Sequence, residues 1–152
     1  MDAVRTHSTP LHVRYHETDQ MGVVHHSNYV NYFELGRTEF MRAHGLDYAE
    51  MERRGVLLAV ADVGLTYLKP ARFGDLLTVE SRLSSVERVR VLFEYEVKRA
   101  DEVLCRGHTL LACVGRDLKP TRIPEEDRAR MAALASTPLV DKRSGRRERH
   151  GP

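Results

Sequence analysis

Residues 89–99 carry the clearest pattern in the chain, because apolar and polar side chains alternate along them. One face would carry Val89, Val91, Phe93, Tyr95 and Val97, and the other Arg90, Glu94, Glu96 and Lys98. A period of two predicts a β-strand with one buried face and one polar face. Similar segments at 11–17, 55–69, 76–83 and 102–116 predict four more strands, and RADE predicts the hairpin turn between the last two.

One long helix is predicted between the first two strands. Ser27 or Asn28 suits its N-cap, and HGLD at 44–47 suits its end near His44. A single apolar stripe would contain Tyr29, Phe33, Gly36 and Phe40. Glycine inside a helix costs about 1 kcal/mol relative to alanine, so Gly36 indicates that another backbone comes close to this face.

These elements, with a short amphipathic helix after Pro124, predict one α+β domain over residues 1–136. We expect an antiparallel sheet of about five strands wrapped around the long helix, with its last four strands in a meander. Such a sheet has open edges. Pairing of edges between two subunits would cover them, so we expect at least a dimer.

The composition, with 41% hydrophobic and 30% charged residues, is that of an ordinary globular chain. No apolar run has the length of a membrane span, and the polar start lacks the apolar core of a signal peptide. A cytoplasmic protein without membrane insertion is therefore expected. The net charge of +2 is uneven, because residues 142–149 hold five basic side chains. Residues 137–152 predict a basic, disordered tail, for which solvation is a simpler role than contact with nucleic acid or anionic lipid.

Reactive side chains gather in YHETDQMGVVHHSNYVNYFE, which runs from Tyr15 to Glu34. His16, Asp19, His25 and His26 are potential metal ligands. However, adjacent histidines on an extended backbone point apart, and no HExxH spacing is present. No metal site is therefore expected.

An acid/base site is the alternative for the same stretch. Gly22 permits a tight turn after Asp19 that leaves backbone N–H groups free. N–H groups at a helix start carry partial positive charge and can hold the oxygen of a polarised carbonyl. Asp19 would attack an acyl group or activate water, with the amides near His25 and His26 as the oxyanion site. From residue types alone, a turn or capping role for Asp19 is the simpler interpretation.

The sequence motifs of several other protein classes are absent from the chain. The chain contains no GxGxxG, no P-loop and no GxSxG. It has no tryptophan, and its aromatic residues fall on the helix stripe and the strand faces, so no stacking platform for nucleic acid is indicated. A nucleotide-binding, serine-hydrolase or nucleic-acid-binding protein is not expected.

The stretch YHETDQMGVVHHSNYVNYFELGRTEFMR resembles the opening motif of hot-dog-fold acyl-CoA thioesterases of the 4-hydroxybenzoyl-CoA thioesterase superfamily. It is most similar to the branch found with the Tol–Pal system of bacteria. The segment YLKPARFGD resembles the turn between the second and third strands of that family. The resemblance covers roughly Leu11 to Met131.

The resemblance implies roles for residues at matching positions. It makes Asp19 the nucleophile or general base, with His26 and Tyr15 as further catalytic residues. Substrate contacts are implied for the loop residues Gly22, Val23, Val24 and His25. The family commonly has tyrosine where this chain has His25, which leaves open whether His25 or His26 contacts the substrate.

The resemblance also implies a dimer or a dimer of dimers, with the acyl pocket at the dimer interface. Residues from the start of the partner's second strand would line that pocket: Leu58, Ala59 and Val60. Arg88 and Arg90 would bind the coenzyme A phosphates, although a solvated strand end is an equal alternative. Glu34 and Arg37 match a glutamate and an arginine of the family helix, and their spacing suits an ion pair as well as catalysis.

The implied function is hydrolysis of a small or medium acyl-CoA to a carboxylate and free coenzyme A, with no cofactor besides the substrate itself. Acyl carrier protein in place of coenzyme A is an alternative. So is a non-catalytic acyl-CoA-binding protein of the same fold, since fold alone does not fix function. A third alternative is a structural partner at the inner membrane, held there by the basic tail.

Overall fold

The computed structural model describes residues 6–135 of the 152-residue chain. Its elements in chain order are β1 (Thr6–His12), the 3-10 helix η1 (Tyr15–Glu17), α1 (Asn28–Ala43), α2 (Tyr48–Arg53), β2 (Leu57–Tyr67), β3 (Leu76–Val86), β4 (Arg90–Arg99), β5 (Glu102–Val114) and α3 (Glu125–Ala132). The basic tail expected at 137–152 lies outside the described residues.

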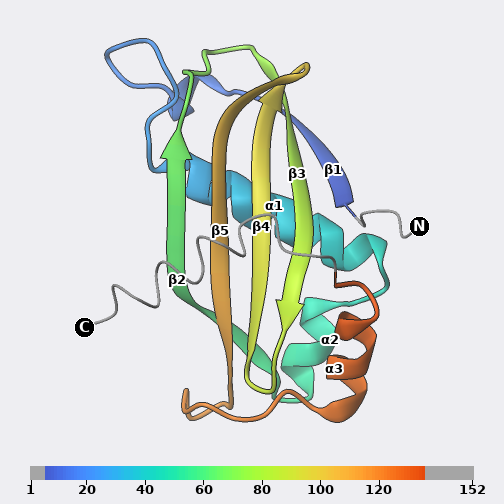
Figure 1. Cartoon of the computed structure of the whole chain (residues 1–152). Helices are drawn as coiled ribbons and strands as arrows, with labels where there is room; N and C mark the ends of the chain where they lie inside the picture. The colour runs from blue at the N-terminus through green and yellow to red at the C-terminus, as the bar shows by residue number, and fades with distance from the viewer. Residues whose placement is uncertain (1–5, 136–152) are drawn as a thin grey trace, which may run out of the picture.

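A five-stranded antiparallel sheet forms the body of the protein, in the order β1-β3-β4-β5-β2. Helix α1 runs across one face of this sheet, and α2 and α3 lie together near the end that carries the β3–β4 hairpin (Figure 1). The predicted α+β fold, an antiparallel sheet wrapped around one long helix, is confirmed.

The core lies between α1 and the sheet and is largely aromatic. Phe33 of α1 stacks on Tyr95 of β4, with ring centroids 4.5 Å apart and planes inclined by 6°. Two turns further along, Phe40 meets Phe93 edge to face at 5.6 Å. Phe33, Phe40 and Phe93 are completely buried. The apolar stripe predicted for the helix is therefore the surface that attaches it to the sheet.

Gly36 lies where α1 comes closest to β3. A Cβ atom on Gly36 would overlap Ser81 Oγ and come within 2.7 Å of Val79 Cγ1. Glycine is thus the residue that permits this approach, and the close contact predicted from its place in the apolar stripe is confirmed.

The predicted meander of the last four strands is wrong at its first connection. Strand β2 pairs with β5 at one end of the sheet, and β3 pairs with β1 and β4. The segment between β2 and β3 therefore crosses from one side of the β4–β5 pair to the other. A pattern of alternating side chains identifies strands but not their neighbours, so this crossover was not visible in the sequence.

The first strand lies earlier in the chain than the expected 11–17 and ends before the reactive stretch. Strand β1 ends at His12, and Tyr15–Glu17 form η1 instead of a continuation of the strand. The cause is the Glu17 side chain, whose Oε1 accepts the Arg14 backbone N–H at 2.8 Å and closes the turn. Tyr15 therefore lies after the strand rather than within it.

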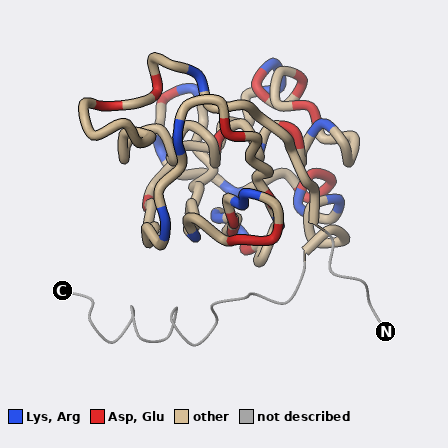
Figure 2. Tube along the Cα trace, turned by 90° about the horizontal axis from the view of Figure 1, so that it is seen from above, with Lys and Arg blue, Asp and Glu red and all other residues tan. Residues whose placement is uncertain are grey.

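Basic and acidic residues alternate around the part of the chain that the structure describes (Figure 2). Neither sign gathers on one side of the trace in this view. Within the same residues, no helix combines the length and apolar character needed to span a membrane.

Replacement of Gly36 by alanine is predicted to destabilise the fold by about 1–3 kcal/mol, the usual cost of forcing extra atoms into a packed core. Alanine favours a helix by itself, so the loss would come from the clash with Ser81 and Val79. Urea unfolding of the wild type and Gly36→Ala measures the difference in the free energy of unfolding. The control is Asn31→Ala on the exposed face of the same helix, expected to change stability by less than about 0.5 kcal/mol. Equal or greater stability of Gly36→Ala would contradict the close contact.

Candidate active site

A tight hairpin turn carries Asp19. Thr18 and Val24 form an isolated antiparallel bridge, and the Asp19 N–H donates to the Val23 carbonyl at 2.9 Å. The Gly22 N–H donates to the Asp19 carbonyl at 2.9 Å, and Gly22 has φ of +80°, a conformation that favours glycine. The tight turn predicted from Gly22 is therefore present, between η1 and α1.

The Asp19 carboxylate is half-buried on this turn. Its Oδ1 accepts the Met21 N–H at 2.9 Å. Within residues 6–135, Oδ2 makes no hydrogen bond and the carboxylate makes no ion pair. One carboxylate oxygen thus holds the turn, and the other is available to a substrate or a water molecule.

Unpaired backbone N–H groups occur at the start of α1. The Val24 N–H donates to the Ala71 carbonyl at 2.8 Å, and the His25 N–H donates to the Glu17 carbonyl at 2.8 Å. By contrast, the N–H groups of His26, Tyr29 and Val30 have no acceptor among the residues described. The amides available for the predicted oxyanion site are therefore those of His26, Tyr29 and Val30, because the N–H groups of His25 and Asn28 are occupied.

The two histidines of the loop differ in their surroundings. Their rings lie 4.1 Å apart and are tilted by 31°. His25 is half-buried, and its Nδ1 accepts the Ser27 N–H at 3.2 Å and lies 2.9 Å from Ser27 Oγ. His26 has an exposed side chain, and its carbonyl accepts the Tyr67 hydroxyl at 3.0 Å. His25 is thus held by the helix start, while the His26 ring is free to meet a substrate.

Glu17 anchors this region, and sequence reasoning missed it. Its buried carboxylate accepts the Tyr32 hydroxyl at 3.0 Å and pairs with the Arg14 guanidinium at 3.2 Å. Its carbonyl accepts both the His25 N–H and Asn28 Nδ2, the latter at 2.9 Å. Glu17 therefore connects η1, the Asp19 hairpin and the first turn of α1. A glutamate three residues after the start of a turn is the signal that indicates such a cap.

The ionisation of Glu17 reflects this network. Burial alone would raise its pKa, but the hydrogen bonds from the Arg14 backbone, Tyr32 and the Arg14 side chain outweigh burial and hold the pKa below its ordinary value. Burial, together with the hydrogen bond to Glu17, raises the pKa of Tyr32. The pair is therefore a carboxylate and a neutral phenol at neutral pH.

Tyr15 lies at the rim of the site. Its ring is 76% exposed and meets Phe73 edge to face at 5.6 Å. Its backbone carbonyl accepts the Thr18 hydroxyl at 2.7 Å. The backbone of Tyr15 supports the hairpin, and its ring borders the site from outside.

The other residues expected to contact substrate are spread over the fold. Val23 and Val24 lie in the hairpin with Asp19, and Val24 is buried. Leu58, Ala59 and Val60 lie on the edge strand β2, where Val60 is 49% exposed. Arg88 and Arg90 belong to the β3–β4 hairpin, at the opposite end of the sheet from the hairpin that carries Asp19 (Figure 1). A single subunit therefore does not bring these two arginines to Asp19.

Arg37 and Glu34 form no ion pair in the described structure. Glu34 is exposed, whereas Arg37 is 6% exposed and donates to the hydroxyls of Tyr48 at 3.1 Å and Tyr95 at 3.2 Å. A weaker contact of 3.4 Å joins it to Thr109. Arg37 thus points into the core, so the ion-pair alternative is wrong.

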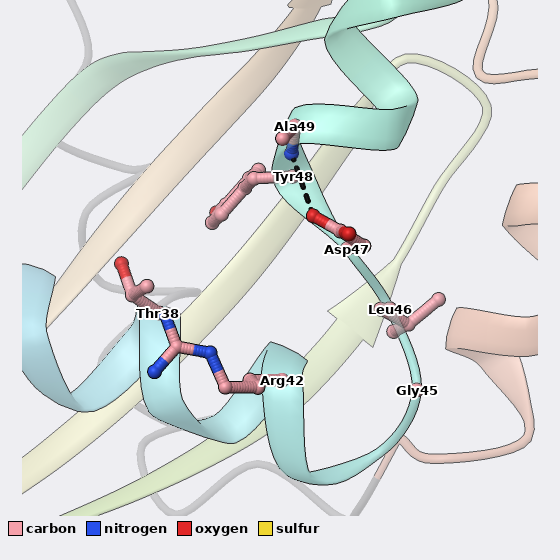
Figure 3. A pocket seen from close by; sticks show the side chains of 7 residues that line it. All are labelled: Thr38, Arg42, Gly45, Leu46, Asp47, Tyr48 and Ala49. Carbon is pink, nitrogen blue, oxygen red and sulfur yellow. Dashed lines mark hydrogen bonds between the residues drawn. The ribbon is translucent and has the colours of Figure 1, made fainter.

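A cavity of about 540 Å³ opens between α1 and α2, away from the Asp19 hairpin (Figure 3). It is lined by Thr38, Arg42, Gly45, Leu46, Asp47, Tyr48 and Ala49. Among residues 6–135, no three His, Cys, Asp or Glu side chains are grouped so that they could hold a metal ion. The cavity therefore does not include the Asp19 hairpin.

Comparison with known proteins identifies the family of the chain. The pattern of the thioesterase-like superfamily matches residues 13–133. The acyl-CoA thioesterase YbgC of Haemophilus influenzae is 33% identical over 126 residues, which cover 80% of this chain and 91% of that protein. The chloroplastic acyl-acyl carrier protein thioesterase ATL2 of Arabidopsis thaliana is 32% identical over 137 residues, 89% of this chain and 73% of that protein.

A solved structure extends the comparison to three dimensions. The DHNA-CoA thioesterase of Staphylococcus aureus matches with a TM-score of 0.80 and 27% identity, over 97% of this chain and 96% of that one. The fold is therefore a hot-dog fold. The chain belongs to the thioesterase-like superfamily. The predicted superfamily and the predicted thioesterase class are confirmed, and the narrower Tol–Pal branch stays a prediction.

Removal of the Glu17 charge is predicted to weaken the fold in a pH-dependent way. Glu17→Gln should cost about 1.5–3 kcal/mol at pH 7, the range for hydrogen bonds to a charged group. Because the folded pKa is lowered, the wild-type advantage is present above the unfolded pKa of about 4.3 and declines as the pH falls through the folded pKa.

Urea unfolding at pH 7, 5, 4 and 3 measures this advantage. The exposed Glu50→Gln serves as the matched control, and a change below about 0.5 kcal/mol is expected for it. A Glu17→Gln variant as stable as the wild type at pH 7 would contradict the anchoring role.

Proposed function

We propose that this protein hydrolyses small or medium acyl-CoA thioesters to a carboxylate and free coenzyme A, with Asp19 as the essential carboxylate. One observation carries the proposal. Asp19 lies on a turn tied through Glu17 to a helix start where the N–H groups of His26, Tyr29 and Val30 are unpaired. A carboxylate beside preorganised donors is the minimum equipment for acyl transfer to water.

The chemistry uses these groups in two steps. Water, activated by Asp19, adds to the thioester carbonyl carbon, or Asp19 itself adds and water then cleaves the resulting anhydride. In both routes the carbonyl oxygen becomes an oxyanion that the unpaired N–H groups stabilise. In the water route the carbon–sulfur bond then breaks to give the carboxylate, whereas in the Asp19 route it breaks as the anhydride forms, before water cleaves that anhydride and frees Asp19. In both routes the thiolate of coenzyme A leaves and takes up a proton. His26, whose ring is exposed, would orient the thioester.

We further propose that the working unit is a homodimer, or a dimer of dimers, joined through β2. This edge strand pairs with β5 on one side only within the described residues. Val60 is 49% exposed and Val63 is 37% exposed on it. An exposed apolar edge strand is a surface that proteins normally cover. Leu58, Ala59 and Val60 of the second copy would then line the acyl pocket.

A second candidate substrate is an acyl group carried on acyl carrier protein. The observation that favours it is the similarity to ATL2, which is named as an acyl-acyl carrier protein thioesterase. The reaction at the thioester would be the same. The two carriers differ in what they present outside the site, so relative turnover on matched substrates separates them.

Asp19→Asn is predicted to lower turnover of acyl-CoA by about 10²- to 10⁴-fold, the range for loss of a positioned acid or base. Asparagine keeps an Oδ1 that accepts the Met21 N–H, so the turn is expected to persist. The measurement is release of free thiol from short, medium and long aliphatic and benzoyl-type acyl-CoAs. A chelator is expected to have no effect.

The matched control is Asp47→Asn. Asp47 Oδ1 accepts the Ala49 N–H at 2.9 Å, which is the same local bond as that of Asp19, but at the far end of α1. Full activity of Asp19→Asn would overturn the mechanism. Tight acyl-CoA binding by the wild type without thiol release would identify a non-catalytic binder instead.

Val60→Glu is predicted to separate the dimer and to lower turnover with it. A carboxylate in each copy of an apolar interface costs several kcal/mol, so the dissociation constant should rise by more than about 100-fold. Light scattering after size exclusion measures the mass, and Val60→Thr of similar shape is the control. A wild type that is monomeric and active, or a Val60→Glu variant that stays dimeric, would contradict pairing through β2.

A further inference from the structure

The turn between β2 and β3 borders the Asp19 hairpin and is rigid without the help of its arginine side chain. The carbonyl of the buried Ala71 accepts the Val24 N–H at 2.8 Å. Asp75 Oδ2 accepts the Arg72 backbone N–H at 2.9 Å and pairs with Arg99 at 2.8 Å. The backbone of residues 71–75 is thus fixed against the hairpin, and the Arg72 side chain extends from it.

The Arg72 guanidinium is close enough to Asp75 for an electrostatic interaction, but the Asp75 carboxylate forms its ion pair with Arg99. Its Nη1 lies 4.0 Å from the position that a Cβ atom of Gly22 would occupy, which places the group beside the Asp19 hairpin. Arg72 forms no ion pair within residues 6–135, whereas neighbouring Arg14 is paired with Glu17 at 3.2 Å. Arg99 is also paired, with Asp75 and Glu102. Arg72 is therefore the cation at this rim that is available to an anionic ligand.

A pair of exposed aromatic rings lies on the same rim. Tyr15 is 76% exposed and Phe73, next to Arg72, is 62% exposed. The two rings meet edge to face at 5.6 Å, which presents a firm apolar surface rather than two mobile side chains. A free guanidinium beside exposed rings is the combination that binds a phosphate and a planar base together.

We propose that Arg72 binds the phosphates of the coenzyme A nucleotide and that Tyr15 and Phe73 hold its adenine. This assignment rests on the proposed acyl-CoA substrate. The rim residues would then help to select coenzyme A as the acyl carrier, while Asp19 carries out the hydrolysis. Arg72 lies beside the Asp19 hairpin of its own subunit, so it can bind the phosphates of a substrate held at that Asp19. Arg88 and Arg90 of the same subunit lie at the other end of the sheet.

The test compares one acyl group on two carriers, coenzyme A and pantetheine, which lacks the nucleotide and its phosphates. For Arg72→Gln, kcat/KM on acyl-CoA should fall about 5- to 30-fold through KM, while kcat/KM on acyl-pantetheine falls less than about twofold. Phe73→Ser should likewise lower the ratio of kcat/KM on acyl-CoA to kcat/KM on acyl-pantetheine. The control is Arg53→Gln, an exposed arginine on α2, for which the ratio is expected to stay at the wild-type value.

Three outcomes would overturn the proposal: an equal loss on both carriers, no loss on acyl-CoA, or a loss of selectivity confined to Arg90→Gln. Weaker binding of Arg72→Gln to anionic vesicles with unchanged selectivity would also overturn it and assign the rim to a lipid surface. If the wild type hydrolyses neither thioester, the proposed function fails by itself. Calorimetric binding of free coenzyme A and pantetheine to wild type and Arg72→Gln then still decides the role of Arg72.

Discussion

The rest of the structure depends on how closely α1 approaches the sheet. Two glycines on different elements permit it. Gly36 removes the side chain that would overlap β3, and Gly107 on β5 removes one that would come within 2.5 Å of Phe33 Cε2. Without these side chains, Phe33 lies flat on Tyr95 and the helix takes one path across the strands. That path fixes where α1 begins, and so it fixes where the chemistry can be.

The start of α1 is held by Glu17 and not by an ordinary cap. Ser27 stands at the N-cap position, but its side chain makes no capping bond to the helix and its hydroxyl lies 2.9 Å from His25 Nδ1. An N-cap hydrogen bond commonly stabilises a helix by about 1 kcal/mol, and α1 lacks that bond. The stability is supplied by the bonds of Glu17 to Tyr32, His25 and Asn28. The N–H groups of Tyr29 and Val30 are thereby left unpaired without loosening the helix, which is what an oxyanion site requires.

Local sequence patterns predicted the elements better than their arrangement. Alternation marked the strands, the apolar stripe marked α1, and Gly36 indicated the close contact, because each is a property of neighbouring residues. The edge position of β2 was missed, since strand order depends on contacts between distant segments. Helix α2 was also missed, because its six residues are too few to show a period.

In the candidate site, too, local features were predicted and long-range contacts were missed. Asp19, Gly22 and the loop to the helix were found because they are contiguous, and the resemblance to a family gave them roles. Arg37 was misjudged because its spacing to Glu34 suggested a local ion pair. Its partners are instead Tyr48, Tyr95 and Thr109, which follow it by 11, 58 and 72 positions. Arg72 was overlooked for the same reason, since its neighbour Gly22 is far away in the sequence.

The edge of β2 and the chemistry of the site are mechanically connected. Tyr67, the last residue of β2, donates its hydroxyl to the His26 carbonyl at 3.0 Å and packs against Tyr29 with ring centroids 5.5 Å apart. Two of the residues whose N–H groups would hold the oxyanion, His26 and Tyr29, are thus in contact with the strand that is open to a second copy. A partner that orders β2 would restrict the same peptides, because a hydrogen bond and a ring contact transmit the constraint. Anything that binds only the ordered state stabilises it by mass action. Association of subunits and preorganisation of the oxyanion site would then be two consequences of the same strand pairing.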